Sequence, residues 1–416
     1  MPGWTVCGGK ELYGKLRVQG AKNAVLPIMA AGILGGGISR VENCPDLTDV
    51  SASLEILRHL GCDVSREDGD IVIDSSNVSE SHIPHELMLK MRSSVMYMGA
   101  ILARTGRVRI SAPGGCELGS RPIDLHLKAL EALGARVSRD GGEVVCQADS
   151  LKGTHINLDF PSVGATENAM LAACAAKGET IITNAAREPE IEDLQLFLRA
   201  KGADIEGAGS SVIRINGFSP RSYAVHRVMP DRIVASTYLC AVAAAGGELW
   251  LENVVSDHIS TVISSLRSMG CHISHDREGL YIARKLPLRA CKPVITKPYP
   301  GFPTDAQALM MAASLKAEGT SVFVENIFEN RYRHVPEMRR LGADIRTEGR
   351  VAMVSGVDEL VGAPVRACDL RGGAALIIAA LSANGVTEIY DSGHVERGYA
   401  DIAGDLNRLG ANIKRM

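Results

Sequence analysis

The chain has 416 residues, of which 46% are hydrophobic, 22% charged and 4% aromatic, and its formal net charge is −3. This length predicts two or three globular domains, and the ordinary hydrophobic content excludes a disordered chain. Because there is no basic excess, a nucleic acid is not expected as the main partner, and any anion site has to be a local cluster of cations.

The sequence also argues against a membrane protein and against a secreted protein. No apolar run reaches the roughly 18 residues of a membrane span, and the N-terminus does not resemble a signal peptide. The ten cysteines form no C-x-x-C pair and mostly lie in apolar stretches, which is typical of free thiols in a reducing cytoplasm. No Cys/His group has zinc spacing, and no G-x-G-x-x-G follows a strand. We therefore expect neither a metal nor another cofactor.

A sixfold internal repeat is the strongest feature of the sequence. A Gly followed by a small, a polar and a β-branched residue recurs at steps of 73, 68, 68, 72 and 68 residues. This period is longer than that of common solenoids, so each unit is expected to be a small α/β module. The copies begin at Gly61, Gly134, Gly202, Gly270, Gly342 and Gly410.

Each unit predicts, in chain order, a helix, a strand, a second helix and two strands. The first helix is a segment of small residues at helical period that a Gly ends, as at 24–34, 95–103, 167–176 and 306–315. A β-branched run follows, and then an amphipathic helix, such as 125–133, leads to the signature Gly. The Ala-rich first helices are apolar nearly all round, so we expect them to be buried inside sheets.

The last unit is incomplete, because the sequence stops six residues after Gly410. Residues 4–19 have Gly turns and are interpreted as its missing strand pair, which would bring the termini together. Three units then form one domain at 21–229, and the other three form a second domain from 1–20 and 230–416. Two chain crossings near 20 and 230 predict a hinge, with a cleft between the domains.

Basic residues mark the starts of four of the six first helices: Lys22, Arg92, Arg232 and Arg371. A cation there opposes the helix dipole at about 0.3–1 kcal/mol. A bound anion would reverse this cost, because the helix amides and the cations would then act together. We expect an anionic ligand in the cleft; solvated charges near helix ends are the alternative. The Ser, Thr, Asp and Asn residues at these starts are expected to cap the helices.

The loop at 111–124 has three glycines and a proline within nine residues, a composition that predicts a mobile loop. Cys116 lies among them and is close in sequence to Arg92, Arg107, Arg109 and Arg121. Because cationic neighbours lower the pKa of a thiol, Cys116 is the candidate reactive cysteine, with a passive loop residue as the alternative. The other cysteines are expected to be small buried residues.

At these helix starts and this loop, the sequence resembles the UDP-N-acetylglucosamine 1-carboxyvinyltransferases, a family of enolpyruvyl transferases. The resemblance covers essentially the whole chain. It implies an inside-out α/β barrel of six βαβαββ repeats in two similar three-repeat domains, which agrees with the repeat count. Its main motifs are Gly20-Ala-Lys22-Asn23, Pro113-Gly-Gly-Cys116, Arg121-Pro-Ile-Asp124, Ser162-Val-Gly-Ala-Thr166, Pro230-Asp-Arg232, Gly301-Phe-Pro-Thr-Asp305, Phe328-Glu-Asn-Arg331, Asp369-Leu-Arg371 and Arg397-Gly-Tyr399.

The resemblance implies that phosphoenolpyruvate gives its enolpyruvyl group to the 3-hydroxyl of UDP-N-acetylglucosamine and releases phosphate, the first committed step of peptidoglycan precursor synthesis. Lys22, Arg121 and Arg397 would clamp phosphoenolpyruvate, with Arg371 near its carboxylate. Cys116 would be the general acid that can also attack C2, and an epoxide phosphonate such as fosfomycin would alkylate it. Asp305 would be the base for the sugar hydroxyl.

Contacts to the sugar nucleotide are implied at a further set of positions, and Arg331 is either part of the site or structural. The alternative for Asp305 is a helix cap. Asp46, Thr48 and Phe160 stand where some relatives have lysines, which puts diphosphate contacts there in doubt. The implied contacts are Asn23, Arg92, Arg121, Pro122, Ile123, Asp124, Leu125, Ser162, Val163, Gly164 and Ile327.

Two rival functions remain open. An enolpyruvyl transferase for shikimate 3-phosphate would share the repeats and the clamp, but its first helix usually starts with Lys-Ser, and it lacks the Pro-Gly-Gly-Cys loop. A non-catalytic sugar-nucleotide sensor derived from the enzyme would keep the binding site after its role had changed. Cys116, Asp305 and Lys22 are all present here, which favours catalysis. The oligomeric state is open, and activity as a monomer is compatible with the sequence.

Overall fold

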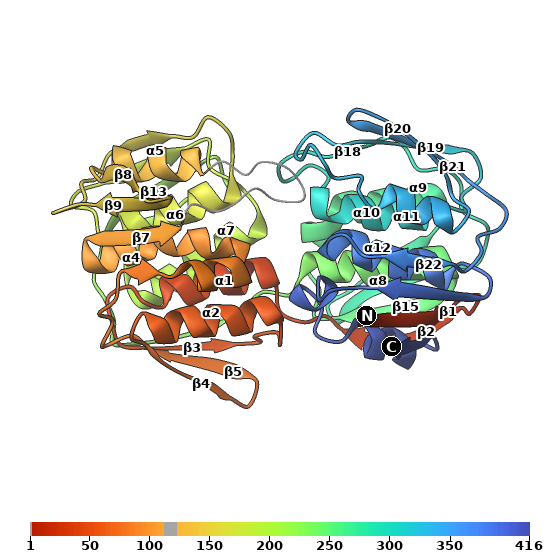
Figure 1. Cartoon of the computed structure of the whole chain (residues 1–416), viewed down its shortest axis with the longest axis horizontal. Coiled ribbons are helices and arrows are strands. Elements are labelled where there is room, and N and C mark those ends of the chain that lie inside the picture. The colour runs from red at the N-terminus through yellow and green to blue at the C-terminus, as the bar shows by residue number, and fades with distance from the viewer. Residues whose placement is uncertain (1, 112–122) are drawn as a thin grey trace. The chain divides into compact units, whose positions relative to one another are not determined.

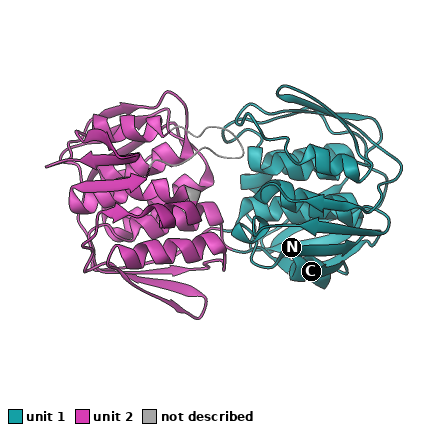
Figure 2. Ribbon diagram, viewed as in Figure 1, with its two compact units in different colours: residues 1–19, 117–119, 230–416 teal, residues 20–116, 120–229 magenta. Residues whose placement is uncertain are grey.

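The computed structural model describes residues 2–111 and 123–416, and these residues form two units (Figure 2). Unit 1 contains 2–19 and 230–416, and unit 2 contains 20–111 and 123–229. Each unit has its own hydrophobic core. No helix among the described residues is both long and apolar enough to cross a membrane.

Unit 2 follows the predicted alternation of helices and strands (Figure 1). Its elements are α1 (Lys22–Ala31), β3 (Ile38–Glu42), α2 (Thr48–His59), β4 (Asp63–Glu67), β5 (Asp70–Asp74), β6 (His82–Ile83), α3 (His85–Lys90), η1 (Arg92–Met96), α4 (Tyr97–Thr105), β7 (Arg107–Ser111), α5 (Asp124–Ala132), β8 (Arg136–Asp140), β9 (Glu143–Gln147), β10 (His155–Asn157), α6 (Val163–Ala173), β11 (Thr180–Thr183), α7 (Pro189–Lys201), β12 (Ala203–Glu206), β13 (Val212–Phe218) and β14 (Tyr223–Arg227).

Unit 1 repeats the pattern. Its elements are β1 (Gly3–Cys7), β2 (Leu12–Arg17), α8 (Arg232–Ala245), β15 (Gly247–Glu252), η2 (Ser256–Ile259), α9 (Ser260–Met269), β16 (His272–His275), β17 (Gly279–Arg284), β18 (Val294–Ile295), α10 (Thr304–Ala313), β19 (Thr320–Val324), α11 (Val335–Arg340), β20 (Asp344–Glu348), β21 (Val351–Ser355), β22 (Pro364–Arg366), α12 (Leu370–Leu381), β23 (Val386–Tyr390), η3 (Val395–Arg397), α13 (Ile402–Arg408) and β24 (Asn412–Arg415).

The signature glycines explain the repeat. All six have φ between 94° and 111°, a left-handed conformation that an L residue with a side chain rarely adopts. Each follows the second helix of its unit and turns the chain into a strand, as predicted for a helix C-terminus. At Gly202 an added Cβ would also lie 1.9 Å from the carbonyl oxygen of Ser219. A glycine is therefore required at this point of the module.

The described strands form six four-stranded sheets of one design. In each sheet a leading strand pairs in parallel with the strand between the two helices, and two antiparallel strands complete the sheet; β10, β11, β13 and β12 are one example. The first helices are buried as predicted: α8, α10 and α12 pack against one another in unit 1, and every residue of α12 from Arg371 to Leu381 is buried.

The interpretation of residues 4–19 as one strand pair is wrong. Only β1 joins the last sheet, where Trp4 pairs with Arg415 of β24, the strand that the C-terminal residues themselves supply. β2 pairs in parallel with β15, from Leu12 opposite Gly247 onward. The reason is burial, because Leu12 and Leu16 lie in the core of unit 1 when β2 fills the leading position of this sheet. β14 fills the same position beside β3 in unit 2.

Candidate functional site

A buried charge cluster lies at the starts of the inner helices of unit 1. Asp305, in the first turn of α10, accepts a hydrogen bond from Arg331 Nη2 at 2.8 Å through Oδ1 and one from Arg371 Nη2 at 3.0 Å through Oδ2. Both arginines are buried, whereas the side chain of Asp305 is 28% exposed. The helix cap of α10 is Pro303, and Asp305 makes no capping bond. The alternative of a simple cap is therefore not observed.

The cations around Asp305 determine its protonation state. Burial alone would raise the pKa of Asp305, but the positive charges of Arg371, Arg331 and Arg232 outweigh burial and hold this pKa well below its usual range. The carboxylate is therefore ionised at physiological pH. It is also a weak base in this arrangement, because protonation would break two ion pairs.

The acids beside the basic helix starts act as caps, as expected. Asp231 Oδ1 accepts hydrogen bonds from Ile233 N at 2.8 Å and Val234 N at 3.0 Å, at the start of α8. Asp369 Oδ1 accepts from Arg371 N at 2.9 Å and from Gly372 N at 3.0 Å, at the start of α12. Each capping carboxylate offsets the cost of the cation that follows it at the same helix end.

Two further predicted residues of unit 1, Arg397 and Ile327, lie on irregular segments. Arg397 is the last residue of η3 and is half-buried. Ile327 follows β19, and its N–H donates to Glu325 Oε1 at 2.8 Å. Sequence reasoning missed Glu325, a buried carboxylate that also accepts from the hydroxyl groups of Thr296 at 3.0 Å and Thr304 at 2.9 Å. Glu325 thus links the segment of Ile327 to the start of α10.

In unit 2, Lys22 starts α1 and forms an ion pair with Asp49 of α2, with 2.7 Å between Nζ and Oδ2. Both side chains are almost fully buried, so the alternative of a solvated charge is wrong for Lys22. The next residue, Asn23, is half-buried. Asp49 was not predicted, because nothing in the local sequence distinguishes it from the acidic residues that commonly begin a helix.

The first turns of α5 and α6 lie side by side in unit 2. Asn168 Nδ2 donates to His126 Nδ1 at 2.7 Å, and a Cβ added at Gly164 would lie 2.9 Å from His126 Cε1. This contact brings together two predicted segments, Ile123, Asp124 and Leu125 with Ser162, Val163 and Gly164. The hydroxyl of Ser162 caps α6 and accepts from Ala165 N at 3.4 Å.

Four predicted residues are described only in part or not at all. Cys116, Arg121 and Pro122 lie outside the described residues, and for Arg92 only the backbone, at the start of η1, is described. The nine described cysteines are free thiols. Burial raises the pKa values of four of them to about 12, which makes them poor nucleophiles: Cys44, Cys62, Cys146 and Cys174.

Asp46, Thr48 and Phe160, where the resemblance implies lysines in some relatives, are exposed. The side chain of Asp46 is 81% exposed and lies 3.4 Å from Arg66 Nη2, and Thr48 starts α2. Phe160 is 45% exposed and stands two residues before Ser162. It is the one exposed phenylalanine among the six in the sequence, all of which lie in the described part of the chain.

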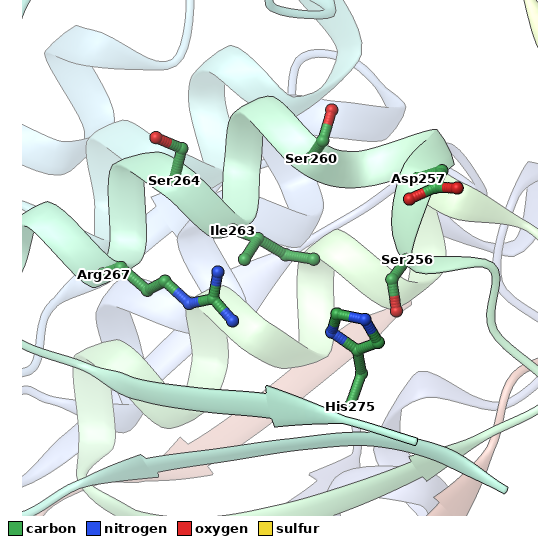
Figure 3. A pocket seen from close by; sticks show the side chains of 7 residues that line it. All are labelled: Ser256, Asp257, Ser260, Ile263, Ser264, Arg267 and His275. Atoms are coloured by element: carbon green, nitrogen blue, oxygen red, sulfur yellow. The ribbon is translucent and has the colours of Figure 1, made fainter. Parts of the chain in front are cut away.

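A separate pocket of about 280 Å³ lies between η2, α9 and β16 (Figure 3). None of the predicted site residues lines it. Its guanidinium group is already engaged, because Arg267 Nη2 donates to the carbonyl oxygen of Ile273 at 2.7 Å. No group of His, Cys, Asp and Glu side chains suited to a metal ion occurs within 2–111 and 123–416. The lining residues are Ser256, Asp257, Ser260, Ile263, Ser264, Arg267 and His275.

Comparisons with known proteins cover the whole chain. The family model described as EPSP synthase (3-phosphoshikimate 1-carboxyvinyltransferase) matches residues 6–406. UDP-N-acetylglucosamine 1-carboxyvinyltransferase 2 of Caldanaerobacter subterraneus is 48% identical, with 98% of each chain covered. The protein of the same name from Carboxydothermus hydrogenoformans is 48% identical, with 100% of each covered.

Solved structures share the fold. The enolpyruvyl transferase NikO from Streptomyces tendae has a TM-score of 0.89 at 26% identity, covering 100% of this chain and 99% of that one. EPSP synthase from Acinetobacter baumannii has a TM-score of 0.77 at 20% identity, with 100% of both chains covered.

Proposed function

This chain belongs to the enolpyruvyl transferase family, and we propose that it transfers the enolpyruvyl group of phosphoenolpyruvate to the 3-hydroxyl of UDP-N-acetylglucosamine. The acceptor is supported by relatives named UDP-N-acetylglucosamine 1-carboxyvinyltransferase that are 48% identical over nearly the full chain. We place the reaction in the cytoplasm, where peptidoglycan precursor synthesis begins.

The observation that carries the proposal is the sharing of Asp305 between Arg331 and Arg371. Two buried guanidinium groups form a site for a carboxylate, because each offers paired N–H donors in a plane. We propose that the carboxylate of phosphoenolpyruvate competes with Asp305 for this arginine pair. When the substrate binds, Asp305 loses hydrogen bonds and positive charge, and its pKa rises toward the range of a useful base.

The reaction then proceeds in two balanced steps. In the first, Asp305 takes the proton of the sugar 3-hydroxyl, the oxygen bonds to C2 of phosphoenolpyruvate, and Cys116 supplies a proton to C3. The product is a tetrahedral ketal that still carries the phosphate. In the second step, the Cys116 thiolate takes a proton from C3, the C2–O bond to phosphate breaks, and the double bond returns, while the proton held by Asp305 leaves with the phosphate. Lys22, Arg121 and Arg397 are proposed to bind the phosphate as it becomes a leaving group.

The sugar nucleotide is assigned to the paired helix starts of unit 2. The first turns of α5 and α6 offer backbone N–H groups and the Ser162 hydroxyl, which suit hydroxyl and carbonyl groups of a nucleotide sugar. Asn23 and Arg92 are proposed to contact the same substrate, together with Ile327 of unit 1. Because neither Phe160 nor Asp46 is cationic, we propose that the diphosphate is bound without a cation at these two positions.

Phosphate release by the purified chain tests the proposal. The enzyme is incubated with phosphoenolpyruvate and either UDP-N-acetylglucosamine or shikimate 3-phosphate. Release with the sugar nucleotide alone is the expected result, and Cys116→Ala should abolish it while UDP-N-acetylglucosamine still binds. Release with shikimate 3-phosphate alone would support the activity by which the family model is described. Sugar-nucleotide binding with no release in either mixture would support a sensor.

A further inference from the structure

His334 is a buried histidine that the proposed reaction does not use. It precedes α11 and is 1% exposed, and neither ring nitrogen makes a hydrogen bond of good distance and angle among the described residues, although the backbone of Arg331 lies close enough to act on the ring. A buried polar group without a partner lowers stability, so a histidine in this state requires an explanation. If the ring served only to fill space, a leucine of similar size would fill it without the cost of burying polar ring nitrogens.

Three other incomplete polar groups belong to the same part of unit 1. Within the described residues, no partner is found for Asp369 Oδ2, Arg331 Nε or Arg371 Nη1. Gly372 shows how close two of the side chains approach: an added Cβ there would lie 2.9 Å from Asp369 Oδ2 and 3.0 Å from His334 Cβ. The absence of a side chain at Gly372 therefore lets His334 and Asp369 approach each other.

The incomplete groups are complementary in donors and acceptors. Asp369 Oδ2 is an acceptor, while Arg331 Nε and Arg371 Nη1 are donors. Burial lowers the pKa of His334 to about 4, and the nearby Arg331 charge acts in the same direction, although Asp369 and the backbone of Arg331 oppose both. The ring is therefore neutral at physiological pH and has one N–H donor and one acceptor nitrogen. A neutral imidazole carries one donor and one acceptor, so it can satisfy both kinds of partner at once.

We propose that His334 is a positioning residue that bridges Asp369 and the arginine pair when the pair holds the carboxylate of phosphoenolpyruvate. One ring nitrogen donates to Asp369 Oδ2, and the other accepts from Arg331 or Arg371. The bridge fixes the first turn of α12, where Asp369 is the cap and Arg371 follows it. Supporting groups of this kind keep substrate-binding side chains in a single geometry. The inference rests on the proposed function, because it assigns the arginine pair to that substrate.

The first test is His334→Leu in the full chain. We expect the KM for phosphoenolpyruvate to rise at least tenfold, the KM for UDP-N-acetylglucosamine to change less than twofold, and the melting temperature to stay equal or rise. Thr387→Val is the matched control, because Thr387 Oγ1 is another buried polar atom of unit 1 without a partner among the described residues. The control should leave both KM values unchanged. Unchanged KM values in the leucine variant would overturn the inference, provided that the wild type is active.

Amide variants and a double-mutant cycle cover the case in which the leucine variant does not fold. His334→Asn and His334→Gln each keep one donor and one acceptor, near Nδ1 and Nε2 respectively. We expect one of them to stay within about fivefold of the wild-type KM and the other to exceed tenfold. Asp369→Asn combined with the worse variant should raise the KM little further, because both changes break the same bridge. Multiplicative effects, or wild-type KM values in both amide variants, would overturn the inference. A wild type that releases no phosphate would instead refute the proposed function.

Discussion

In both units, predicted site residues lie at the starts of buried helices, but the charged groups near these helix starts differ between the units. In unit 1, Asp305 binds two arginines at once, and a third cation, Arg232, also acts on it. In unit 2, Lys22 forms an ion pair with Asp49, and the neighbouring helix starts meet through neutral groups such as Asn168 and His126. Unit 1 thus gathers three guanidinium groups around Asp305, which suits a small anion, whereas the neutral groups of unit 2 suit a polar, mostly uncharged surface such as a sugar or a base.

The largest expected effect comes from removing the shared carboxylate of unit 1. Asp305→Asn should lower kcat by roughly 10²–10⁴-fold, the usual contribution of a general base. Phosphate release measures it. Asp257→Asn, which alters a carboxylate lining the separate pocket, is the control and should leave kcat unchanged. If Asp257→Asn lost activity and Asp305→Asn kept it, the site would have to be moved to that pocket.

Breaking the Lys22–Asp49 ion pair of unit 2 should lower stability as well as activity. Lys22→Met leaves Asp49 buried without its ammonium partner, which should cost about 3–5 kcal/mol of unfolding free energy. Urea unfolding measures this loss. Adding Asp49→Asn should restore most of the stability but none of the turnover, because the phosphate would still lack its cation. Recovery of turnover in the double variant would contradict the role proposed for Lys22.

One buried histidine in each unit, His126 and His334, predicts how the unfolding free energy depends on pH. Burial lowers the pKa of His126 and of His334 to about 4, from 6.5 in the unfolded chain. The unfolded chain binds these protons first, so the free energy of unfolding is highest above pH 6.5, where both rings are neutral in either state, and it falls as the pH drops toward 4. The loss is roughly 3 kcal/mol for each ring. Unfolding free energies at pH 7 and pH 5 should differ less in His126→Asn and in His334→Leu than in the wild type; an equal difference would show that folding does not lower the pKa values of these rings.

The smallest expected effect concerns Phe160. Phe160→Lys places a cation two residues before Ser162 and should tighten UDP-N-acetylglucosamine binding by about two- to fivefold at low salt, as expected for an exposed charge pair. Calorimetric titration measures it at two salt concentrations. The control Phe160→Gln removes the aromatic ring without adding a charge, so it separates the two effects of Phe160→Lys. Tighter binding that does not weaken with salt would argue against a contact with the diphosphate.

The repeat and most helix starts could be predicted, because they depend on local chemistry. The six signature glycines are needed for a left-handed turn wherever they occur, and a segment of small residues at helical period is visible without its neighbours. The capping acids Asp231 and Asp369 were recognisable for the same reason.

Tertiary partners could not be predicted. β2 pairs with the strand beside which Leu12 and Leu16 become buried. That strand is β15, which lies more than 200 residues away in the sequence. Tertiary packing likewise determines which residues form ion pairs with Lys22 and Asp305. His334 gave no local signal at all, because a histidine before a short helix is ordinary until its burial is known.

The position of β1 has a consequence for how the protein is synthesised. β1 leaves the ribosome first, yet its partners β23 and β24 belong to the opposite end of the sequence. The described residues of unit 2, 20–111 and 123–229, have all emerged before those of unit 1 from 230 onward. Unit 2 can therefore fold during translation, while the first strands of unit 1 still lack their partners and expose apolar side chains. The nascent N-terminal segment is where a chaperone has the most to protect.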